Sequence, residues 1–514
     1  MVKNRKYLFL SVFLCGMTVL AVEFTASRML QTVYGTSNIV WANVIGLTLL
    51  FLTMGYFIGG WLADRYPRPL LFYGLITAAG FSSIFFLLLT SLILRTTTLT
   101  LTQFNAGAII GSFAGVFMAI AVPVTLLGCI SPFAIRLGVP DVEHAGRISG
   151  RIYAISTWGS LLGTYLPVLW IIPVAGSRIT AVIFGAVLLV VGLIGIWQEA
   201  ESVRPKAAAA VACLLLIPFV VAWTPGGIKQ TPGQVFETES PYNYIEVIKN
   251  RSCYYLFLNE GAAIHSFYCD DGSLPPQTSV YRTLTIAPLF AHPEDFQNHP
   301  VQNVAIVGLG AGTIAKLMTR VYGEMRFDGI ELDPKIVDVG RKYFDMNEPE
   351  LNVHVGDGRY KLNKLAGGYD VVVIDAYKPP YIPWHLTTVE YFEEVKSKLN
   401  ESGSIAINVY RPGRDRRLVN AMVATLMRVF PSIYTIDARG DNTIIVATVK
   451  PTRHENVQQN FDALVTDDTE IIPSAMEVFH AGLKPLEPSD VIFTDQVAPV
   501  EPLIDSMVLR QLRL

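Results

Sequence analysis

The residues best suited to chemistry in this sequence are three carboxylates that each follow an apolar run. Glu331 lies in GIELDP, Asp357 in HVGDG and Asp375 in VVVIDAY. Parallel strands bring their carboxyl ends to one edge of a sheet, where α/β proteins bind ligands, so we expect these side chains to gather there. A carboxylate after the second strand can accept hydrogen bonds from ribose hydroxyls, and one after the third can accept from the adenine amine. The set predicts a nucleoside-binding pocket.

A glycine loop precedes these carboxylates, in VAIVGLGAGT. Gly308, Gly310 and Gly312 would let the backbone turn tightly and approach a ligand before a helix begins near Thr313. Thr313 stands where a dinucleotide fingerprint has glycine, so GxGxG describes the loop better. Strands that alternate with helices predict a Rossmann-like α/β domain.

Two residues near this edge are candidates to accept or release a proton. Asp375 is the first, because it closes the fourth strand at the ligand-binding edge. His385, in IPWHL, is the second, because an ordinary pKa near 6.5 suits proton transfer. The alternative for His385 is a capping or packing role beside a helix that begins near Thr387.

The composition places the first half of the chain in a membrane. Of 514 residues, 51% are hydrophobic and only 16% are charged, which is too apolar for a soluble protein of this size. The net charge of −3 shows no basic excess, so we expect no nucleic-acid partner. Seven segments approach the roughly 20 apolar residues that cross a bilayer. They are 7–29, 39–62, 70–94, 106–130, 152–172, 179–197 and 207–223.

These segments predict an N-terminal α-helical membrane bundle of about seven spans over residues 1–224, with the lipid bilayer as its partner. Basic residues such as Arg65, Arg136 and Arg147 lie on the same side as the basic N-terminus, which predicts a cytoplasmic N-terminus. Seven crossings would then put the C-terminal region outside the cytoplasm. A cytosolic nucleotide cofactor favours the opposite side, so the side of this region stays open in a multi-pass protein of the cell membrane.

A small antiparallel β unit is expected at residues 225–276, where strand-like runs follow a Pro- and Gly-rich linker. In CYYLFLNEGAAIHSFYC, Cys253 and Cys269 lie almost symmetrically about a turn. A hairpin would place the two thiols opposite each other, so that they can form a disulfide in an oxidising compartment. The alternative is a pair of ordinary buried strand cysteines.

Taken together, residues from about Gln234 to Arg510 resemble the spermidine synthase family, and the whole chain resembles its membrane-bound, multi-pass branch. The resemblance rests on the small β unit, then on SVYRTL, GLGAG, IELD, VHVGDG and IDAY in that order. It implies a synthase-like domain of the Rossmann-like, methyltransferase-type fold over residues 277–514. It also implies a polyamine aminopropyltransferase, which moves an aminopropyl group from decarboxylated S-adenosylmethionine to an amine acceptor without a metal.

The resemblance also implies roles for individual residues. Glu331 would bind the donor ribose and Asp357 the adenine, above a loop formed by the three glycines Gly308, Gly310 and Gly312. Tyr281, in SVYRTL, would line the gap between donor and acceptor.

Two positions depart from the family pattern. Ala311 stands where the glycine loop usually carries an aspartate that holds the donor's amine, and Lys378 stands where a second aspartate follows Asp375. A lysine would repel a polyamine. Three functions therefore stay open, namely an aminopropyltransferase with an altered acceptor, an S-adenosylmethionine-dependent methyltransferase acting on a membrane-associated acceptor, and a non-catalytic binding or assembly subunit. A homo-oligomer and a membrane complex also stay open.

Overall fold

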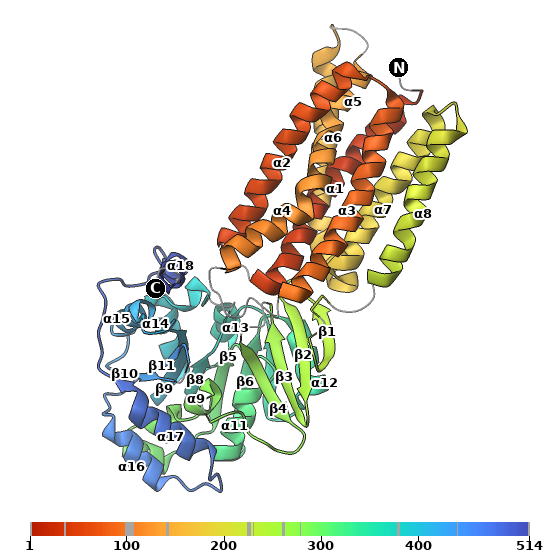
Figure 1. Cartoon of the computed structure of the whole chain (residues 1–514). Coiled ribbons are helices and arrows are strands. Elements are labelled where there is room, and N and C mark those ends of the chain that lie inside the picture. Colours follow the sequence, from red (N-terminus) through yellow and green to blue (C-terminus); the bar gives the residue numbers. More distant parts are fainter. Residues whose placement is uncertain are drawn as a thin grey trace. The chain divides into compact units, whose positions relative to one another are not determined.

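The computed structural model describes two compact units (Figure 1). One comprises Met1–Glu246 with Leu258–Ala262, and the other Val247–Phe257 with Ala263–Leu514. The described residues are 3–34, 38–97, 107–139, 143–223, 228–229, 231–259, 263–277, 279–377, 381–438 and 440–511. Lys378, on which one of the expectations above depends, lies outside them.

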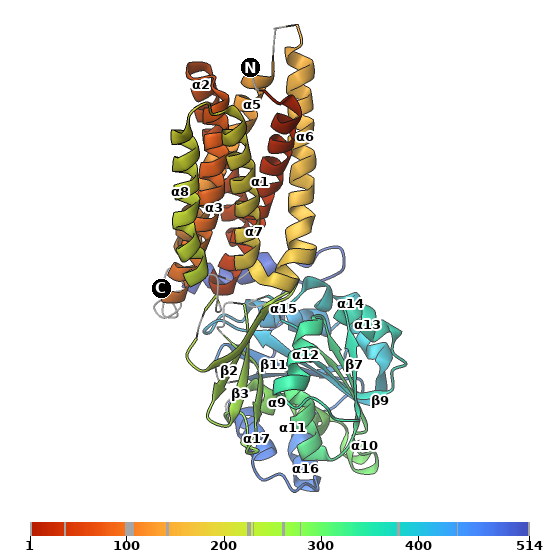
Figure 2. The same cartoon turned by 90° about the vertical axis from the view of Figure 1, so that its right-hand side faces the viewer.

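The first unit is built mainly of long apolar helices that run alongside one another (Figures 1 and 2). An apolar run in hydrocarbon must satisfy its backbone groups internally, which the α-helix does. The helices are α1 (Arg5–Tyr34), α2 (Asn38–Arg65), α3 (Pro69–Thr97), α4 (Gly107–Gly128), α5 (Ile130–Gly138), α6 (Ala145–Leu166), α7 (Ile172–Glu199) and α8 (Val203–Trp223).

The predicted number of spans was wrong. Within the described residues, five helical stretches are long and apolar enough to cross a membrane, not seven. Two predicted segments belong to one stretch, Ala145–Glu199, because the chain continues from α6 through a π-helical turn, Pro167–Ile171, into α7. The direction changes only at Gly176, whose φ of 80° is not helical. Helix α8 is not among the five stretches.

Small residues let α1 and α6 approach closely. A side chain at Gly159 or Gly163 of α6 would collide with the carbonyl oxygens of Phe13 and Met17 on α1. This backbone-to-backbone contact suits a membrane, where close packing rather than water exclusion holds helices together.

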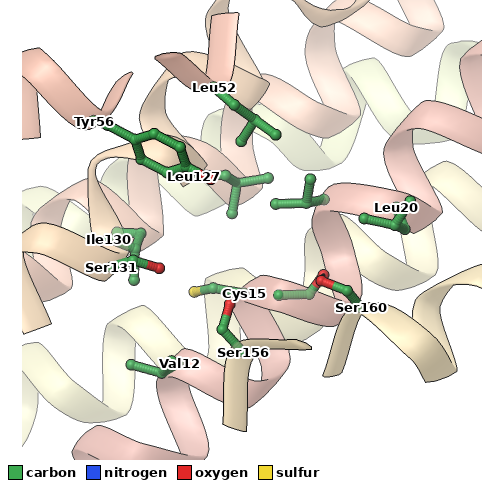
Figure 3. A pocket seen from close by; sticks show the side chains of 12 residues that line it. Val12, Cys15, Leu20, Leu52, Tyr56, Leu127, Ile130, Ser131, Ser156 and Ser160 are labelled. Carbon is green, nitrogen blue, oxygen red and sulfur yellow. The ribbon is translucent and has the colours of Figure 1, made fainter. Parts of the chain in front are cut away.

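A cavity of about 90 Å³ lies in the helical unit among α1, α2, α4, α5 and α6 (Figure 3). Its polar lining comes from Cys15, Ser131, Ser156, Ser160 and the half-exposed Tyr56, and the rest of the lining is apolar or glycine. The hydroxyl of Ser160 donates to a backbone carbonyl of α1, at 3.0 Å.

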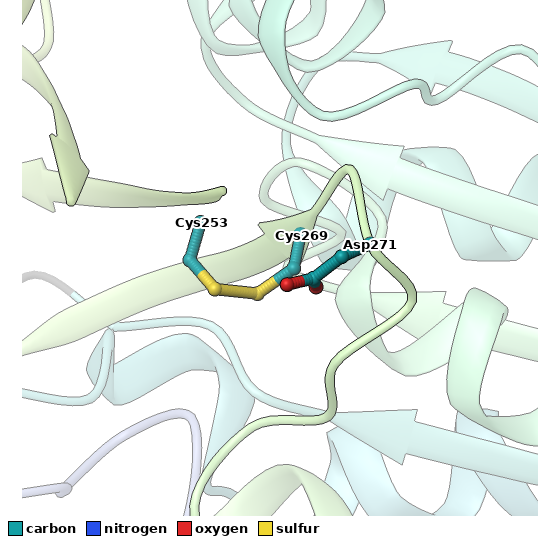
Figure 4. A group of neighbouring side chains, drawn as sticks. All are labelled: Cys253, Cys269 and Asp271. Atoms are coloured by element: carbon teal, nitrogen blue, oxygen red, sulfur yellow. A yellow bond between two sulfur atoms is a disulfide. The ribbon is translucent and has the colours of Figure 1, made fainter. Parts of the chain in front are cut away.

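The small β unit is a four-stranded sheet in sequential order. Its strands are β1 (Gln234–Glu239), β2 (Tyr244–Asn250), β3 (Cys253–Leu258) and β4 (Ile264–Cys269). Strands β3 and β4 pair antiparallel with Cys253 opposite Cys269. A disulfide joins the two cysteines (Figure 4), which is the first of the two alternatives given for them above. Asp271 lies close to both sulfur atoms, but the disulfide leaves no thiolate to ligate a metal with it.

The large sheet has eight strands in the order β12-β10-β11-β9-β8-β5-β6-β7. They are β5 (Asn303–Val307), β6 (Arg326–Glu331), β7 (Leu351–Val355), β8 (Tyr369–Ile374), β9 (Leu399–Tyr410), β10 (Ser432–Asp437), β11 (Asn442–Thr448) and β12 (Leu483–Lys484). Strands β9, β8, β5, β6 and β7 are parallel, and β11 enters antiparallel between β9 and β10. This confirms the predicted Rossmann-like, methyltransferase-type fold.

Helices cover both faces of this sheet. They are α9 (Val280–Leu284), α10 (Pro293–Asn298), α11 (Thr313–Tyr322), α12 (Pro334–Tyr343), α13 (Gly358–Lys364), α14 (Val389–Lys398), α15 (Arg417–Leu426), α16 (Glu455–Ala463), α17 (Ile471–Gly482) and α18 (Val500–Gln511). Because side chains alternate along a strand, Val304 and Ile306 of β5 enter the core shared with α11 and α17, whereas Ala305 and Val307 enter the core shared with α14 and α15. Figure 2 shows α11 and α12 on one face.

The disulfide generates a stability prediction. Replacing Cys253 and Cys269 together by alanine frees a loop with a sequence separation of 16, which should lower the free energy of unfolding by about 3 kcal/mol. We expect a lower thermal midpoint for the purified protein in detergent, and a reductant should lower the wild-type midpoint similarly. The matched control replaces the free cysteines Cys15 and Cys129 by alanine. This variant keeps the disulfide, so its midpoint should still fall with reductant, whereas the midpoint of the Cys253/Cys269 variant should not respond. An unchanged midpoint in the Cys253/Cys269 variant would contradict the prediction.

Candidate nucleoside-binding site

The glycine loop after β5 takes a backbone path that glycine favours. Gly308, Gly310 and Gly312 have φ angles of 89°, 57° and 87°, in the left-handed region that other residues rarely adopt. A side chain at Gly308 would also lie 2.5 Å from the carbonyl oxygen of Asp375, at the end of the neighbouring strand β8. The loop therefore passes directly over the edge where β5 and β8 end.

Strand β4 holds this loop from the side. The hydroxyl of Ser266 accepts the backbone N–H of Ala311 at 2.8 Å. Thr313, the first residue of α11, accepts the N–H of Phe267 at 2.8 Å and donates to its carbonyl at 3.1 Å. Ser266 was not predicted from the sequence, because a serine in a strand has no local pattern that marks a partner 45 residues away.

Glu331 ends β6 and is buried beneath the loop. One carboxylate oxygen accepts the N–H of Gly310 at 2.9 Å, and the other accepts the N–H of Asp333 at 3.0 Å. Burial raises the pKa of Glu331 to about 7, although both backbone hydrogen bonds lower it. The carboxylate proposed for ribose binding is therefore already tied to the glycine loop.

Asp357 follows β7 and caps the short helix α13. One oxygen accepts the backbone N–H of Tyr360 at 3.0 Å, and the other lies 2.8 Å from Nε2 of His385. His385 belongs to a 3₁₀ turn, Trp384–Leu386, in the connection between β8 and α14. The structure thus pairs His385 with the predicted adenine carboxylate, an arrangement that neither sequence alternative contained.

Asp375 lies at the end of β8 in a half-buried position. Its carboxylate accepts a hydrogen bond from the side-chain amide of Asn408 on β9, at 2.9 Å. The amide oxygen of Asn408 in turn accepts from Asn442 at 2.7 Å, which fixes the direction in which Asn408 donates. Burial raises the pKa of Asp375 to about 7, so this carboxyl can both accept and release a proton near neutral pH.

Tyr281 lies on α9 and is buried, with its hydroxyl donating to the carbonyl of Ile264 at 2.7 Å. Burial raises its pKa well above the ordinary value, and the charge of Asp375 raises it further. The hydroxyl is therefore neutral and lies within electrostatic reach of Asp375, at the end of the small sheet where β4 meets the glycine loop. The structure brings Gly308, Glu331, Asp375 and Tyr281 to one edge.

Comparison with known proteins identifies the domain that carries this edge. Residues 278–439 match the spermine/spermidine synthase domain. The carboxyl-terminal part of the chain therefore carries a spermidine synthase domain.

The matches to individual proteins cover only part of this chain, and for two named relatives they cover less than two thirds of the relative's own length. It is 30% identical over 285 residues to a probable polyamine aminopropyl transferase of Bifidobacterium longum, and the match spans 52% of this chain and 61% of that protein. It is 28% identical over 175 residues to the mouse eEF1A lysine and N-terminal methyltransferase, over 32% of this chain and 25% of that protein. A solved probable spermidine synthase from Corynebacterium glutamicum has 19% identity and a TM-score of 0.38, and covers 50% of this chain and 98% of its own.

The raised pKa of Asp375 generates a prediction about stability. The ordinary pKa is 3.8 and the folded value is about 7, so the folded protein binds more protons between these values and loses stability as the pH rises through this range. Asp375→Asn removes this titration. We expect the variant to be more stable than the wild type at pH 8, with a gain that shrinks as the pH falls towards 5. Thermal unfolding across pH measures this, and Asp338→Asn, on the exposed face of α12, serves as the control. A gain that does not depend on pH would contradict the prediction.

Proposed function

We propose that the second unit is a membrane-anchored aminopropyltransferase that uses decarboxylated S-adenosylmethionine and an amine acceptor. The observation that carries this proposal is the half-buried Asp375, within electrostatic reach of Tyr281, at the sheet edge where Glu331 holds the glycine loop. In this proposal Glu331 and Asp357 bind the ribose and the adenine of the donor, and Tyr281 separates donor from acceptor. The match to a spermine/spermidine synthase domain supports the same assignment.

The reaction releases one proton, and in this proposal Asp375 accepts it. The acceptor nitrogen attacks the methylene carbon next to the sulfonium, so that an N–C bond forms while the C–S bond breaks. The electron pair of the broken bond stays on sulfur, and neutral methylthioadenosine leaves. The attacking nitrogen becomes cationic and gives up one proton. A carboxylate with a pKa of about 7 accepts that proton effectively near neutral pH.

A methyltransferase is the second candidate, and Ala311 favours it. The glycine loop offers a small apolar side chain there, and its backbone N–H is already used by Ser266. No carboxylate at this position selects a donor by its free amine. The similarity to a eukaryotic lysine and N-terminal methyltransferase is consistent with intact S-adenosylmethionine as the donor.

We also propose that the first unit anchors the protein in a lipid bilayer and that the synthase-like domain lies outside the cytoplasm. The five apolar stretches support the anchor. The Cys253–Cys269 disulfide supports the side, because structural disulfides persist in oxidising compartments. The acceptor would then be an amine in that compartment or at the membrane surface.

Product analysis tests the transferase proposal. Protein purified in detergent is incubated with amines and either donor, and the leaving nucleoside is identified by mass spectrometry. We expect methylthioadenosine with the decarboxylated donor, and a loss of about 10²- to 10⁴-fold in rate for Asp375→Asn, because the proton acceptor is gone. Equilibrium binding of methylthioadenosine should change little in that variant.

Two results would redirect this assignment. S-adenosylhomocysteine formed from intact S-adenosylmethionine would replace the aminopropyltransferase by the methyltransferase. If neither nucleoside rose above the level of a no-protein control, both the aminopropyltransferase and the methyltransferase would be refuted. The Asp338→Asn variant is the matched control, since it also removes one carboxylate from this unit but lies on the exposed face of α12.

Thiol labelling of intact cells tests the side of the membrane. A membrane-impermeant maleimide should label Cys253 and Cys269 only after treatment with a membrane-impermeant reductant, since both cysteines are oxidised in the folded protein. A variant that lacks both provides the background from the other cysteines. Labelling that requires permeabilised cells would place the domain in the cytoplasm.

A further inference from the structure

The pairing of His385 with Asp357 connects two distant parts of the site. The Nε2 atom of His385 lies 2.8 Å from one oxygen of Asp357, and the backbone N–H of Tyr360 donates to the other oxygen. A carboxylate only accepts hydrogen bonds, so the imidazole is assigned the tautomer that donates from Nε2 to Asp357. Each oxygen of Asp357 therefore has one fixed donor and keeps a further lone pair for a ligand.

This pair reaches across the ligand-binding edge of the sheet. Asp357 follows β7 and His385 belongs to the connection after β8, and two strands, β5 and β6, lie between β8 and β7. The glycine loop follows β5, and Glu331 ends β6. Asp375, directly after β8, therefore lies at one end of this edge, and His385, in the same connection, lies at the other end beside Asp357. A second contact supports it there, because Arg359 donates to the carbonyl of His385 at 3.4 Å.

Three exposed apolar side chains lie close in sequence to the residues of this site. Leu332 follows Glu331, Val355 precedes the Gly356–Asp357 turn and Trp384 precedes His385, and all three are at least 40% exposed. The ring of Trp384 meets the imidazole edge-on, with the ring centres 5.8 Å apart. Apolar faces beside a hydrogen-bonding acid suit a flat base with a polar edge.

We infer that His385 is a positioning residue for the base of the donor, an inference that rests on the proposed nucleoside site. By donating to Asp357, His385 holds that carboxylate in one orientation, so that its free lone pairs accept from an exocyclic amine. The same lone pairs repel a carbonyl oxygen. His385 therefore sets the preference for a 6-aminopurine over a 6-oxopurine.

Calorimetric binding of two ligands to the full chain in detergent tests this inference. The ligands are methylthioadenosine and its 6-oxo analogue methylthioinosine, which differ only at the edge that Asp357 would read. We expect the wild type to prefer methylthioadenosine by about tenfold, because the 6-oxo group of methylthioinosine would set an acceptor against the acceptor oxygens of Asp357. His385→Leu should weaken methylthioadenosine by about tenfold and leave methylthioinosine within about twofold. His385→Gln, which retains an N–H donor, should restore most of the loss.

The chain itself offers a matched control. His354 on β7 also lies 2.8 Å from an aspartate, Asp328, and its side chain is 30% exposed, against 31% for His385. This second pair belongs to strands β6 and β7 and lies outside the predicted nucleoside site. His354→Leu should therefore leave the preference between the two ligands unchanged. A thermal midpoint for each variant shows that it is folded.

The outcomes separate this inference from the proposed function. If the wild type binds neither ligand, the nucleoside site is refuted and the role of His385 with it. If the wild type binds methylthioadenosine but His385→Leu weakens both ligands equally, or His385→Gln does not restore binding, His385 only packs the connection and the inference alone fails. A loss confined to the 6-amino ligand and restored by glutamine supports it.

Discussion

The candidate site depends on how a loop without useful side chains is held in place. Three glycines in left-handed conformations let the backbone after β5 pass over the sheet edge, but glycine supplies no side chain to anchor that path. The anchors come from two other strands. Ser266 on β4 accepts the N–H of Ala311, and Glu331 on β6 accepts the N–H of Gly310. Strand β4 of the small sheet and strand β6 of the large sheet therefore both hold the loop, and the other site residues lie around it.

Burial of acids is the second constraint. Glu331 and Asp375 lie where desolvation disfavours their charged forms, and the pKa of each is about 7. Such placements cost stability, and they are concentrated where proton transfer or ligand binding offsets that cost. Asn408 and the backbone of Gly310 satisfy part of each carboxyl group, so the acids are oriented without being fully neutralised.

Strand β4 connects the disulfide of the small sheet to the candidate site. It carries Cys269, which is fixed to Cys253, and three residues earlier Ser266, which holds the glycine loop. The carbonyl of Ile264, at the start of the same strand, accepts from Tyr281. One strand thus positions the loop and the tyrosine, and the disulfide limits the movement of that strand against β3.

Local pattern in the sequence determined the strand–glycine–helix order, the carboxylates at strand ends and the facing cysteines, because strand period, turn geometry and backbone freedom act over a few residues. Only the tertiary structure decided that His385 meets Asp357, that Asn408 lies under Asp375, and that Ser266 holds Ala311. These pairs are 28, 33 and 45 residues apart, and they meet because the sheet orders its strands β8-β5-β6-β7 and packs β4 beside them. The number of long apolar stretches likewise could not be read from hydropathy alone. It depended on a helix that continues through Pro167 and turns at Gly176.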